Sequence, residues 1–474
     1  MPKKKTKIVC TLGPSADDCS TLGKMMDAGM NVARLNFSHG SYDHMRKIVQ
    51  NLQKAKKNTG KNVALLQDLQ GPKIRIGKLP KGGISLKRGQ TIVLSTEKKP
   101  FKEKPRYTIP VQYKDLHKDV KTGDRLLIND GYLEVQVQKK NKHHIICKVK
   151  IGGLLESNKG INSPNASISA ETITAKDRKD LEFGLTQGIH YVALSFVKSA
   201  ADIEELRQIL RKKGHPDIQI IAKIERHEAI QDLEAIVKAT DGIMVARGDL
   251  GLEIPAEKVP VVQKEIIRLG LIHGKPVIIA TQILESMIHN PRATRAEISD
   301  AANTIFDHAD AFMLSGETSV GKYPIRAVRT LAKVAYATET ELRKKEHLLA
   351  NPILTEDMPI TDATCYNAAH LAEDIKARAI VIITRSGYTA RQFMKHRPRI
   401  PVIAITYSDH VKCQLQLVWG MNKVFVSKEE METAKSADKL VPKVLKKLKI
   451  VKPGQEIVIV NAGRKNNFLK TVVI

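Results

Sequence analysis

Aromatic residues, paired cysteines and long apolar segments are all scarce in this chain of 474 residues. Aromatic residues make up 4% of the sequence and include a single tryptophan, which argues against a surface that binds nucleic acid by base stacking. The five cysteines form no C-x-x-C pair and no metal-ligand spacing, so they indicate reduced thiols and a cytoplasmic protein. They are Cys10, Cys19, Cys147, Cys365 and Cys413.

Apolar segments of membrane-spanning length are also missing, since none approaches the roughly 18 residues that a transmembrane helix needs. The lysines at positions 3–5 are not followed by the apolar segment of a secretory signal, so we expect no such signal. Positive charge is abundant, and the net charge is +28. Because the lysines are scattered, this excess favours a solvated surface, and we expect neither nucleic acid nor a membrane as a partner.

Eight short strand-like segments recur along the chain, and helical periodicity fills most of the intervals between them. The segments are residues 7–13, 31–37, 63–67, 191–196, 219–224, 242–246, 276–281 and 311–314. Helices are predicted at 202–212, 228–239, 261–271 and 295–307, the last of them beginning with a Thr294-x-x-Glu297 capping box. This alternation predicts a (β/α)8 TIM barrel.

Two regions depart from the barrel pattern, in keeping with the roughly three domains that the length suggests. Alternating segments at 91–95, 125–128, 133–138 and 144–151 predict an inserted all-β domain, placed as a lid over the active-site face. A helix at 363–375 and strands at 379–384, 401–406, 423–426 and 456–460 predict a C-terminal α/β domain. The expected boundaries are 1–70 and 171–342 for the barrel, 71–170 for the lid and 343–474 for the C-terminal domain.

Charged residues stand at the C-terminal ends of two predicted strands. Lys223 and Glu225 end one segment, and Arg247 and Asp249 follow the next. Enzymes of the α/β class place their chemistry at this end of buried parallel strands. The carboxylates suit a hard cation such as Mg2+, and the cations favour an anionic, phosphorylated ligand. Taken alone, each motif is about as compatible with solvated charges at a strand end.

Seven longer motifs extend this pattern over essentially the whole chain. They are KIVCTLGP (7–14), VARLNFSHG (32–40), IAKIE (221–225), DGIMVARGDLGLEI (241–254), ATQILESM (280–287), PRATRAE (291–297) and MLSGET (313–318). In this order they resemble the pyruvate kinase family. The resemblance implies phosphoryl transfer from phosphoenolpyruvate to ADP, giving pyruvate and ATP in the last step of glycolysis. It also implies a homotetramer and a regulatory role for the C-terminal domain.

The resemblance assigns roles to the residues at the strand ends. Glu225 and Asp249 match ligands of a divalent cation, Mg2+ or Mn2+. Lys223 matches the catalytic lysine, and Arg34 matches a residue that grips the phosphate, for which a forked guanidinium is well suited. Gly248 and Asp249 lie in a Gly-x-x-Gly turn whose amides would hold the substrate carboxylate.

Further residues match the proton relay and the nucleotide site. Thr281 matches a hydroxyl near the enolate carbon, and Ser315 and Glu317 match water-linked relay positions. For Ser315 a helix cap is the alternative, and for His39 an ordinary loop histidine. The nucleotide-side phosphate contacts are implied to be Asn36, His39, Arg75 and Lys176.

The chain departs from the family's pattern after the third strand. Potassium-dependent members carry Asp-Thr-Lys-Gly-Pro-Glu there, whereas this chain reads Asp68-Leu-Gln-Gly-Pro-Lys73. Lys73 stands where the glutamate helps to hold K+, so we expect its ammonium to replace the ion and K+ not to be required. The remaining potassium ligands are matched by Asn36, Ser38, Asp68 and Leu69.

A candidate effector loop follows the first strand of the C-terminal domain. Thr384, Arg385, Ser386 and Thr389 resemble the family's effector-phosphate loop, although a strand-to-helix turn with a serine cap is about as compatible. Residues 463–468 replace the family's Gly-x-Thr-Asn-Thr stretch. We therefore expect at most weak activation by fructose 1,6-bisphosphate, and favour a sugar monophosphate or nucleotide.

Two other functions remain open from the sequence. Lys, Glu and Asp at strand ends also suit a metal-dependent carbon–carbon lyase acting on an oxo-acid, although a lyase would not need the anion contacts of Arg34, Arg75 and Lys176. A basic nucleic-acid-binding or scaffold protein is disfavoured by the low aromatic content and by the acidic metal positions.

Overall fold

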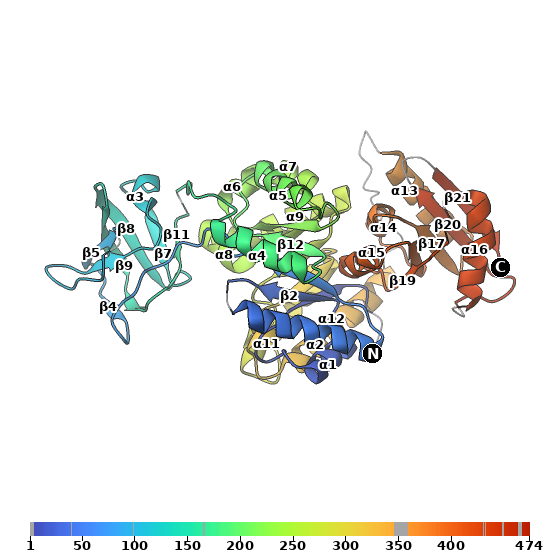
Figure 1. Cartoon of the computed structure of the whole chain (residues 1–474), viewed down its shortest axis with the longest axis horizontal. Helices are drawn as coiled ribbons and strands as arrows, with labels where there is room; N and C mark the ends of the chain where they lie inside the picture. The colour runs from blue at the N-terminus through green and yellow to red at the C-terminus, as the bar shows by residue number, and fades with distance from the viewer. Residues whose placement is uncertain are drawn as a thin grey trace.

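Three bodies lie in a row along the long axis of the molecule (Figure 1). The structure is a computed structural model that describes residues 4–38, 40–97, 99–164, 166–345, 359–429, 431, 433–447, 450–462 and 467–474. The inserted domain lies at one end, the barrel in the middle and the C-terminal domain at the other end. The chain leaves the barrel after β3 (Ala64–Asp68) and returns before α4 (Ala175–Thr186), so two connecting segments carry the inserted domain.

The middle body is a closed barrel of parallel strands in the order β1-β16-β15-β14-β13-β12-β3-β2. Its strands are β1 Lys7–Thr11, β2 Val32–Asn36, β3 Ala64–Asp68, β12 Tyr191–Leu194, β13 Gln219–Ile224, β14 Gly242–Ala246, β15 Val277–Ala280 and β16 Ala311–Leu314. Each predicted segment coincides with one strand to within a few residues, so the predicted barrel is confirmed. The strands are buried nearly throughout, because helices cover their outer faces and side chains fill the interior.

The covering helices follow the prediction with one exception. They are α1 Cys19–Ala28, α2 Tyr42–Thr59, α4 Ala175–Thr186, α5 Ala200–Lys212, α6 His227–Gln231, α7 Leu233–Ala239, α9 Val259–His273, α10 Arg295–Phe306 and α12 Pro324–Lys345. The helix predicted at 228–239 is broken at Asp232, whose carboxylate instead accepts a hydrogen bond from the Ala200 amide at 2.9 Å. The capping box of Thr294 and Glu297 is present. None of the described helices is long and apolar enough to cross a membrane.

The inserted domain is all-β, as predicted, and has its own core. A six-stranded sheet in the order β11-β7-β8-β9-β5-β6 lies beside the two-stranded pair β10-β4. Its elements are β4 Ile84–Leu86, β5 Thr91–Ser95, β6 Thr108–Pro110, α3 Leu116–Asp119, β7 Arg125–Ile128, β8 Leu133–Lys140, β9 His144–Ile151, β10 Gly153–Leu155 and β11 Ile161–Asn162. The sequence predicted four of these strands and missed those of two or three residues, which are too short to show alternation.

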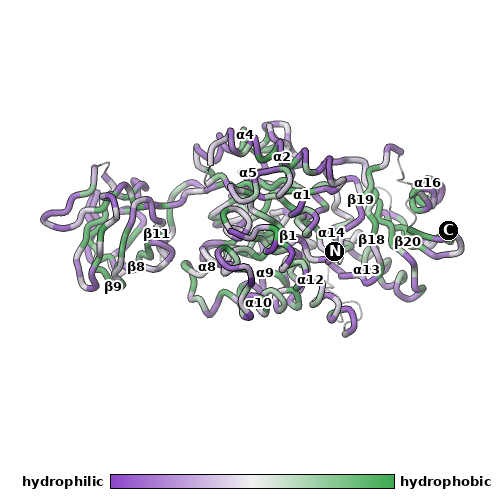
Figure 2. Tube along the Cα trace, turned by 90° about the horizontal axis from the view of Figure 1, so that it is seen from below, coloured by the Kyte–Doolittle hydropathy of each residue, from purple (hydrophilic) through white to green (hydrophobic). Residues whose placement is uncertain are grey.

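The C-terminal domain contains one sheet in the order β19-β18-β17-β20-β21 with helices packed against it. Its elements are α13 Ile360–Asp374, β17 Ala379–Ile383, α14 Tyr388–Met394, β18 Val402–Thr406, α15 Asp409–Gln414, β19 Lys423–Val426, α16 Ala434–Lys447, β20 Glu456–Ala462 and β21 Asn467–Val473. Strands such as β18 and β20 are apolar, whereas loops around them are more hydrophilic (Figure 2). The antiparallel edge strand β21 was not predicted, because its residues alternate poorly.

The expectation that the lysine excess is simply a solvated surface is wrong at the N-terminus. Lys5 and Lys7 are buried where the barrel meets the C-terminal domain. The Lys7 ammonium donates to the Met421 carbonyl at 2.8 Å, and the Lys5 ammonium donates to the Pro398 carbonyl at 2.6 Å. Lys5 also lies 4.6 Å above the ring of Trp419, the single tryptophan. These cations therefore join the two domains.

The burial of Lys5 makes the stability of this junction depend on pH. Burial first, and then the charge of Arg343, lowers the pKa of Lys5 from 10.5 to about 7. Between these values the unfolded chain binds more protons than the folded chain, so the free energy of unfolding rises with pH. We therefore expect the free energy of unfolding of the wild type, minus that of Lys5→Met, to increase from pH 7 to pH 10. Urea titrations followed by Trp419 fluorescence measure it. The exposed Lys24→Met variant should show a constant difference, and a constant difference for Lys5→Met would contradict the prediction.

Candidate active site

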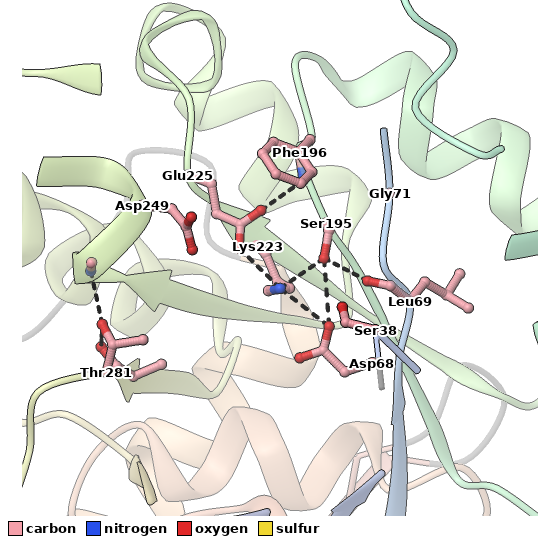
Figure 3. A network of polar contacts seen from close by, with 12 residues as sticks. Ser38, Asp68, Leu69, Gly71, Ser195, Phe196, Lys223, Glu225, Asp249 and Thr281 are labelled. Carbon is pink, nitrogen blue, oxygen red and sulfur yellow. Dashed lines mark hydrogen bonds and ion pairs between the residues drawn. The ribbon is translucent and has the colours of Figure 1, made fainter. Parts of the chain in front are cut away.

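The predicted catalytic residues gather at the C-terminal ends of the barrel strands (Figure 3). Arg34 lies on β2, Asp68 ends β3, and Lys223 lies near the end of β13. Glu225 directly follows β13. Because these strands run parallel around one closed barrel, side chains that are far apart in the sequence meet at a single edge.

Lys223 forms the centre of this group. Its ammonium donates to Ser195 Oγ at 2.7 Å and to Asp68 Oδ1 at 3.1 Å, and it pairs with Glu225 Oε1 at 2.9 Å. Burial alone would lower the pKa of Lys223, but Asp68 and Glu225 outweigh that effect and raise it. The ammonium is therefore a permanent positive charge, and the alternative of a solvated charge at a strand end does not apply.

Arg34 is fixed by the same aspartate. Its Nε donates to Asp68 Oδ2 at 2.6 Å, and its Nη1 donates to Thr11 Oγ1 at 2.8 Å. Burial would raise the pKa of Asp68, but Arg34 and Lys223 outweigh burial and lower it. Asp68 thus stays ionised and holds both cations in place.

Glu225 and Asp249, the predicted metal ligands, are neighbours at this edge of the barrel (Figure 3). Glu225 is 2% exposed and its Oε2 accepts a hydrogen bond from the Phe196 amide at 2.8 Å. Burial raises the pKa of Glu225 against the effect of Lys223, and the neighbouring Asp249 carboxylate adds to the rise. The oxygens of the two carboxylates form a set of ligands suited to a hard divalent cation.

The predicted Gly-x-x-Gly turn is instead the first turn of a short helix, α8 (Arg247–Glu253). The Gly248 amide donates to Thr281 Oγ1 at 2.8 Å, so it is not free for a substrate carboxylate. Arg247, expected to favour an anionic ligand, instead pairs with Asp300 and with backbone carbonyls. The prediction therefore placed these residues at the right edge of the barrel but in the wrong local structure.

The proton-relay residues line a cavity of about 720 Å³ next to α8. Thr281 follows β15, and Ser315 and Glu317 follow β16. Ser315 precedes helix α11 (Gly316–Ser319), but its hydroxyl makes no capping hydrogen bond, which argues against the cap alternative. The Glu317 carboxylate accepts hydrogen bonds from the Ser315 amide at 2.7 Å and from the Leu284 amide at 3.0 Å. Burial raises the pKa of Glu317.

The predicted nucleotide contacts lie around the edge of the site. Lys176 donates to the Phe37 carbonyl at 2.7 Å and pairs with Asp180 at 2.6 Å, beside a hollow of about 480 Å³. Arg75 lies in the inserted domain, where its guanidinium donates to the Asn158 carbonyl at 3.1 Å. His39 lies outside the described residues.

The predicted potassium ligands already have protein partners. Both oxygens of Asp68 accept from cationic side chains, and the Leu69 carbonyl accepts from Ser195 Oγ at 2.6 Å. The side chain of Asn36 accepts from the Ser38 amide at 3.1 Å. The Lys73 ammonium lies 3.8 Å from Asp249 Oδ1, on the metal side of the site.

The effector residues differ in accessibility. Arg385 and Ser386 are exposed, whereas Thr384 and Thr389 are buried. The Thr389 hydroxyl donates to the Ala462 carbonyl at 3.4 Å, so it faces the domain core. Residues 463–466 of the altered C-terminal stretch lie outside the described residues.

Several functional contacts were missed in the sequence. Ser195 and the Phe196 amide follow β12 at the same edge of the barrel, so the rule that singled out Lys223 could have found them. Two cations hold the returning segment of the inserted domain. Arg226 donates to the Ala166 carbonyl at 3.1 Å, and Lys198 donates to the Ala170 carbonyl at 3.0 Å. Contacts to backbone carbonyls leave no sequence motif.

Comparisons with known proteins agree over the whole chain. Two family models match, "Pyruvate kinase, barrel domain" over residues 3–328 and "Pyruvate kinase, alpha/beta domain" over residues 362–472. A pyruvate kinase of Bacillus licheniformis is 43% identical over 483 residues, which cover 99% of this chain and 80% of that protein. One of Mycobacterium tuberculosis is 41% identical over 459 residues, covering 96% and 94%. The crystal structure of a pyruvate kinase from Cryptosporidium parvum has a TM-score of 0.90 at 35% identity and covers 99% of this chain and 96% of that one.

The position of Lys223 leads to a prediction about turnover. We expect Lys223→Met to lower kcat by at least about 100-fold, the usual cost of removing one preorganised charge-stabilising donor. The thermal midpoint should also fall, because Asp68 and Glu225 lose the cation between them. Steady-state kinetics and thermal unfolding measure both effects, with the exposed Lys24→Met as the matched control. Turnover within about tenfold of wild type, a loss of only ~1.4 kcal/mol, would show that the role of Lys223 is wrong.

Proposed function

This chain belongs to the pyruvate kinase family and transfers a phosphoryl group from phosphoenolpyruvate to ADP, and we propose that the residues around Lys223 carry out this reaction. Membership of the family decides against the carbon–carbon lyase and the basic scaffold protein. The observation that carries the proposal is the contact of the buried Lys223 ammonium with Asp68, Ser195 and Glu225. Pyruvate formation, coupled to lactate dehydrogenase in the presence of phosphoenolpyruvate, ADP and Mg2+, tests it.

Arg34 and Lys223 supply the positive charge that phosphoryl transfer requires. Both are held by Asp68 before any substrate binds, so little reorganisation is needed when charge develops. We assign Arg34 to the phosphate of phosphoenolpyruvate. We assign Lys223 to the transferring group and to the enolate that is left behind.

Glu225 and Asp249 are the residues that would hold Mg2+ or Mn2+. Their carboxylate oxygens are the ligands that these ions prefer; burial, with the Asp249 charge beside it, raises the pKa of Glu225, and a bound cation would offset that rise. When bound, the ion neutralises charge on the phosphoryl and enolate oxygens. The side chains around it keep Glu225 oriented through the Phe196 amide and Lys223.

Protonation of enolpyruvate falls to Thr281, Ser315 and Glu317. They line one cavity, and the raised pKa of Glu317 lets its carboxyl group hold a proton closer to neutral pH. Gly248 contributes through its hydrogen bond to Thr281, and we assign the substrate carboxylate to the amide of Asp249 in the first turn of α8. The proton is delivered to carbon 3 of the enolate from this side of the site.

The nucleotide is assigned to the side of the barrel mouth that carries Asn36, His39, Arg75 and Lys176. The hollow beside Lys176 offers room for the nucleoside. Arg75 belongs to the inserted domain, so movement of this domain toward the barrel would bring its guanidinium to the phosphates of ADP.

We further propose that activity does not require K+. The two oxygens of Asp68 that would bind the ion already accept from Arg34 and Lys223, which lowers their attraction for a further cation, and the Leu69 carbonyl accepts from Ser195 Oγ. Lys73 adds a fixed positive charge 3.8 Å from the Asp249 carboxylate. That charge is placed where it can assist a phosphate bound between Asp249 and Arg34, while it disfavours a second monovalent cation nearby.

A homotetramer in the cytoplasm and a phosphate effector complete the proposal. Exposed apolar side chains on the barrel, Val261, Phe306 and Val320, offer surface for a subunit contact, as does the free edge of β21. The exposed residues Arg385 and Ser386 remain the candidate effector contacts. With two of the four hydroxyl and guanidinium groups of that loop buried, we maintain that fructose 1,6-bisphosphate activates weakly at most.

The potassium proposal predicts that adding KCl at matched ionic strength stimulates the enzyme less than a few-fold in Tris or tetramethylammonium buffer. Lys73→Glu should lower activity in the absence of K+ and restore stimulation by the ion, because it replaces a fixed cation by a carboxylate that attracts one. Lys73→Gln is the control that removes the charge without supplying a ligand. Strong stimulation of the wild type by K+ would show that Lys73 does not replace the ion.

The assembly proposal predicts a closed, symmetric tetramer in solution. Sedimentation velocity at micromolar concentration should give one species with four times the chain mass of 52.7 kDa. A monomer under these conditions would rule out the tetramer.

A further inference from the structure

The backbone at the end of β15 is held in an unusual conformation. Thr281 has φ 64° and Gln282 has φ 54°, so two successive residues other than glycine lie in the left-handed region. This region is sparsely populated, and it is least favourable for a β-branched residue such as threonine. Such conformations persist where surrounding groups hold them, and they concentrate at functional sites.

The side chain of Arg247 is the group that holds this backbone. Its Nη2 donates to the carbonyl of Thr281 at 3.1 Å and to the carbonyl of Gln282 at 2.9 Å. Its Nη1 donates to both carboxylate oxygens of Asp300, at 3.0 and 2.8 Å. The guanidinium is thereby fixed between α10 and the loop, where Nη2 bridges two successive backbone carbonyls.

Gly248, the residue after Arg247, donates a hydrogen bond to the side-chain hydroxyl of Thr281. The Gly248 amide donates to Thr281 Oγ1 at 2.8 Å, and that hydroxyl donates to the Ala280 carbonyl at 2.6 Å. Figure 3 shows this bond between Thr281 and the first turn of α8. Backbone and side chain of Thr281 are therefore both fixed from the N-terminus of α8, beside the metal carboxylate of Asp249.

We propose that Arg247 is a positioning residue, whose guanidinium keeps the Thr281 backbone left-handed and so directs the Thr281 hydroxyl toward the enolate. The inference rests on the proposed function of Thr281. It replaces the expectation that Arg247 attracts the anionic substrate, because its donors are bound to Asp300 and to the loop. Arg247 touches no reacting atom in this assignment.

The test compares Arg247→Gln and Arg247→Lys with Thr281→Ala and with the double variant Arg247→Gln/Thr281→Ala. Steady-state kinetics give kcat and the KM for phosphoenolpyruvate. Exchange of the methyl protons of pyruvate with D2O, followed by NMR, reports the proton-transfer half of the reaction alone. The exposed Arg268→Gln variant on α9 is the matched control, and thermal unfolding checks that each variant is folded.

We expect Arg247→Gln to lower kcat and the exchange rate at least tenfold, with less than a threefold change in KM. Arg247→Lys should recover part of this loss, since a single ammonium keeps the positive charge but lacks the second nitrogen that pairs with Asp300 while the first holds the carbonyls. In the Thr281→Ala background the same substitution should cost less than threefold, because the group that it positions is gone. If Arg247→Gln does not fold, Asp300→Asn, which keeps the guanidinium but weakens its anchor, should give the same pattern at smaller amplitude.

Two outcomes would overturn the inference while leaving the proposed function intact. In the first, the fold losses of kcat in the two single variants multiply in the double variant, which would mean that Arg247 acts independently of Thr281. The other is a rise in KM at unchanged kcat, which would make Arg247 a substrate-binding residue. Full activity of Thr281→Ala would instead remove the role of Thr281, and the inference with it.

Discussion

One buried ammonium group holds the active site together. Transfer of a charged side chain from water into a protein is costly unless the charge is paired and hydrogen-bonded, and Lys223 meets that condition with Asp68, Glu225 and Ser195. Asp68 in turn fixes Arg34, so Arg34 and Glu225, to which we assign the phosphate and the metal, both depend on the same lysine. The positive charges of Lys223 and Arg34 are nearly cancelled by the negative charges of Asp68 and Glu225. A bound phosphate therefore needs the further positive charge that a divalent ion brings.

The closed barrel is what makes this cluster possible. β2, β3, β12 and β13 are neighbours in space although an inserted domain separates β3 from β12 in the sequence. That domain is attached at the same edge, where Arg226 and Lys198 hold the carbonyls of its returning segment. Arg226 directly follows Glu225 in the chain, so the metal carboxylate and the base of the lid share one short stretch of backbone.

The sequence was sufficient for features that repeat or that end a buried strand. Apolar segments with the right spacing identified all eight barrel strands, and the charged residues at the end of β13 identified Lys223 and Glu225, whereas Thr281 came from the resemblance to the family. It was insufficient where structure depends on contacts between distant parts of the chain. The sequence predicts a glycine turn where the structure has helix α8, because the hydrogen bond from the Gly248 amide to Thr281 forms only when the chain has folded. The left-handed backbone at Thr281 and Gln282 gives no sequence signal, because neither residue is one that favours this conformation.

Contacts between distant parts of the chain also explain part of the high net positive charge, because some of the basic side chains hold the folded structure together. Several buried or half-buried cations donate to backbone carbonyls, as Lys7 does to Met421 and Arg397 does to His308. A carbonyl satisfies the donor without supplying a counter-charge, so burial lowers the pKa of Lys5 and Lys7, whereas Arg397 and Arg247 are also paired with Asp310 and Asp300. At the domain junction these contacts fix two bodies together, and at β15 the contact of Arg247 fixes a strained loop. Composition alone does not distinguish such cations from solvated ones, since the difference lies in the partner that each finds after folding.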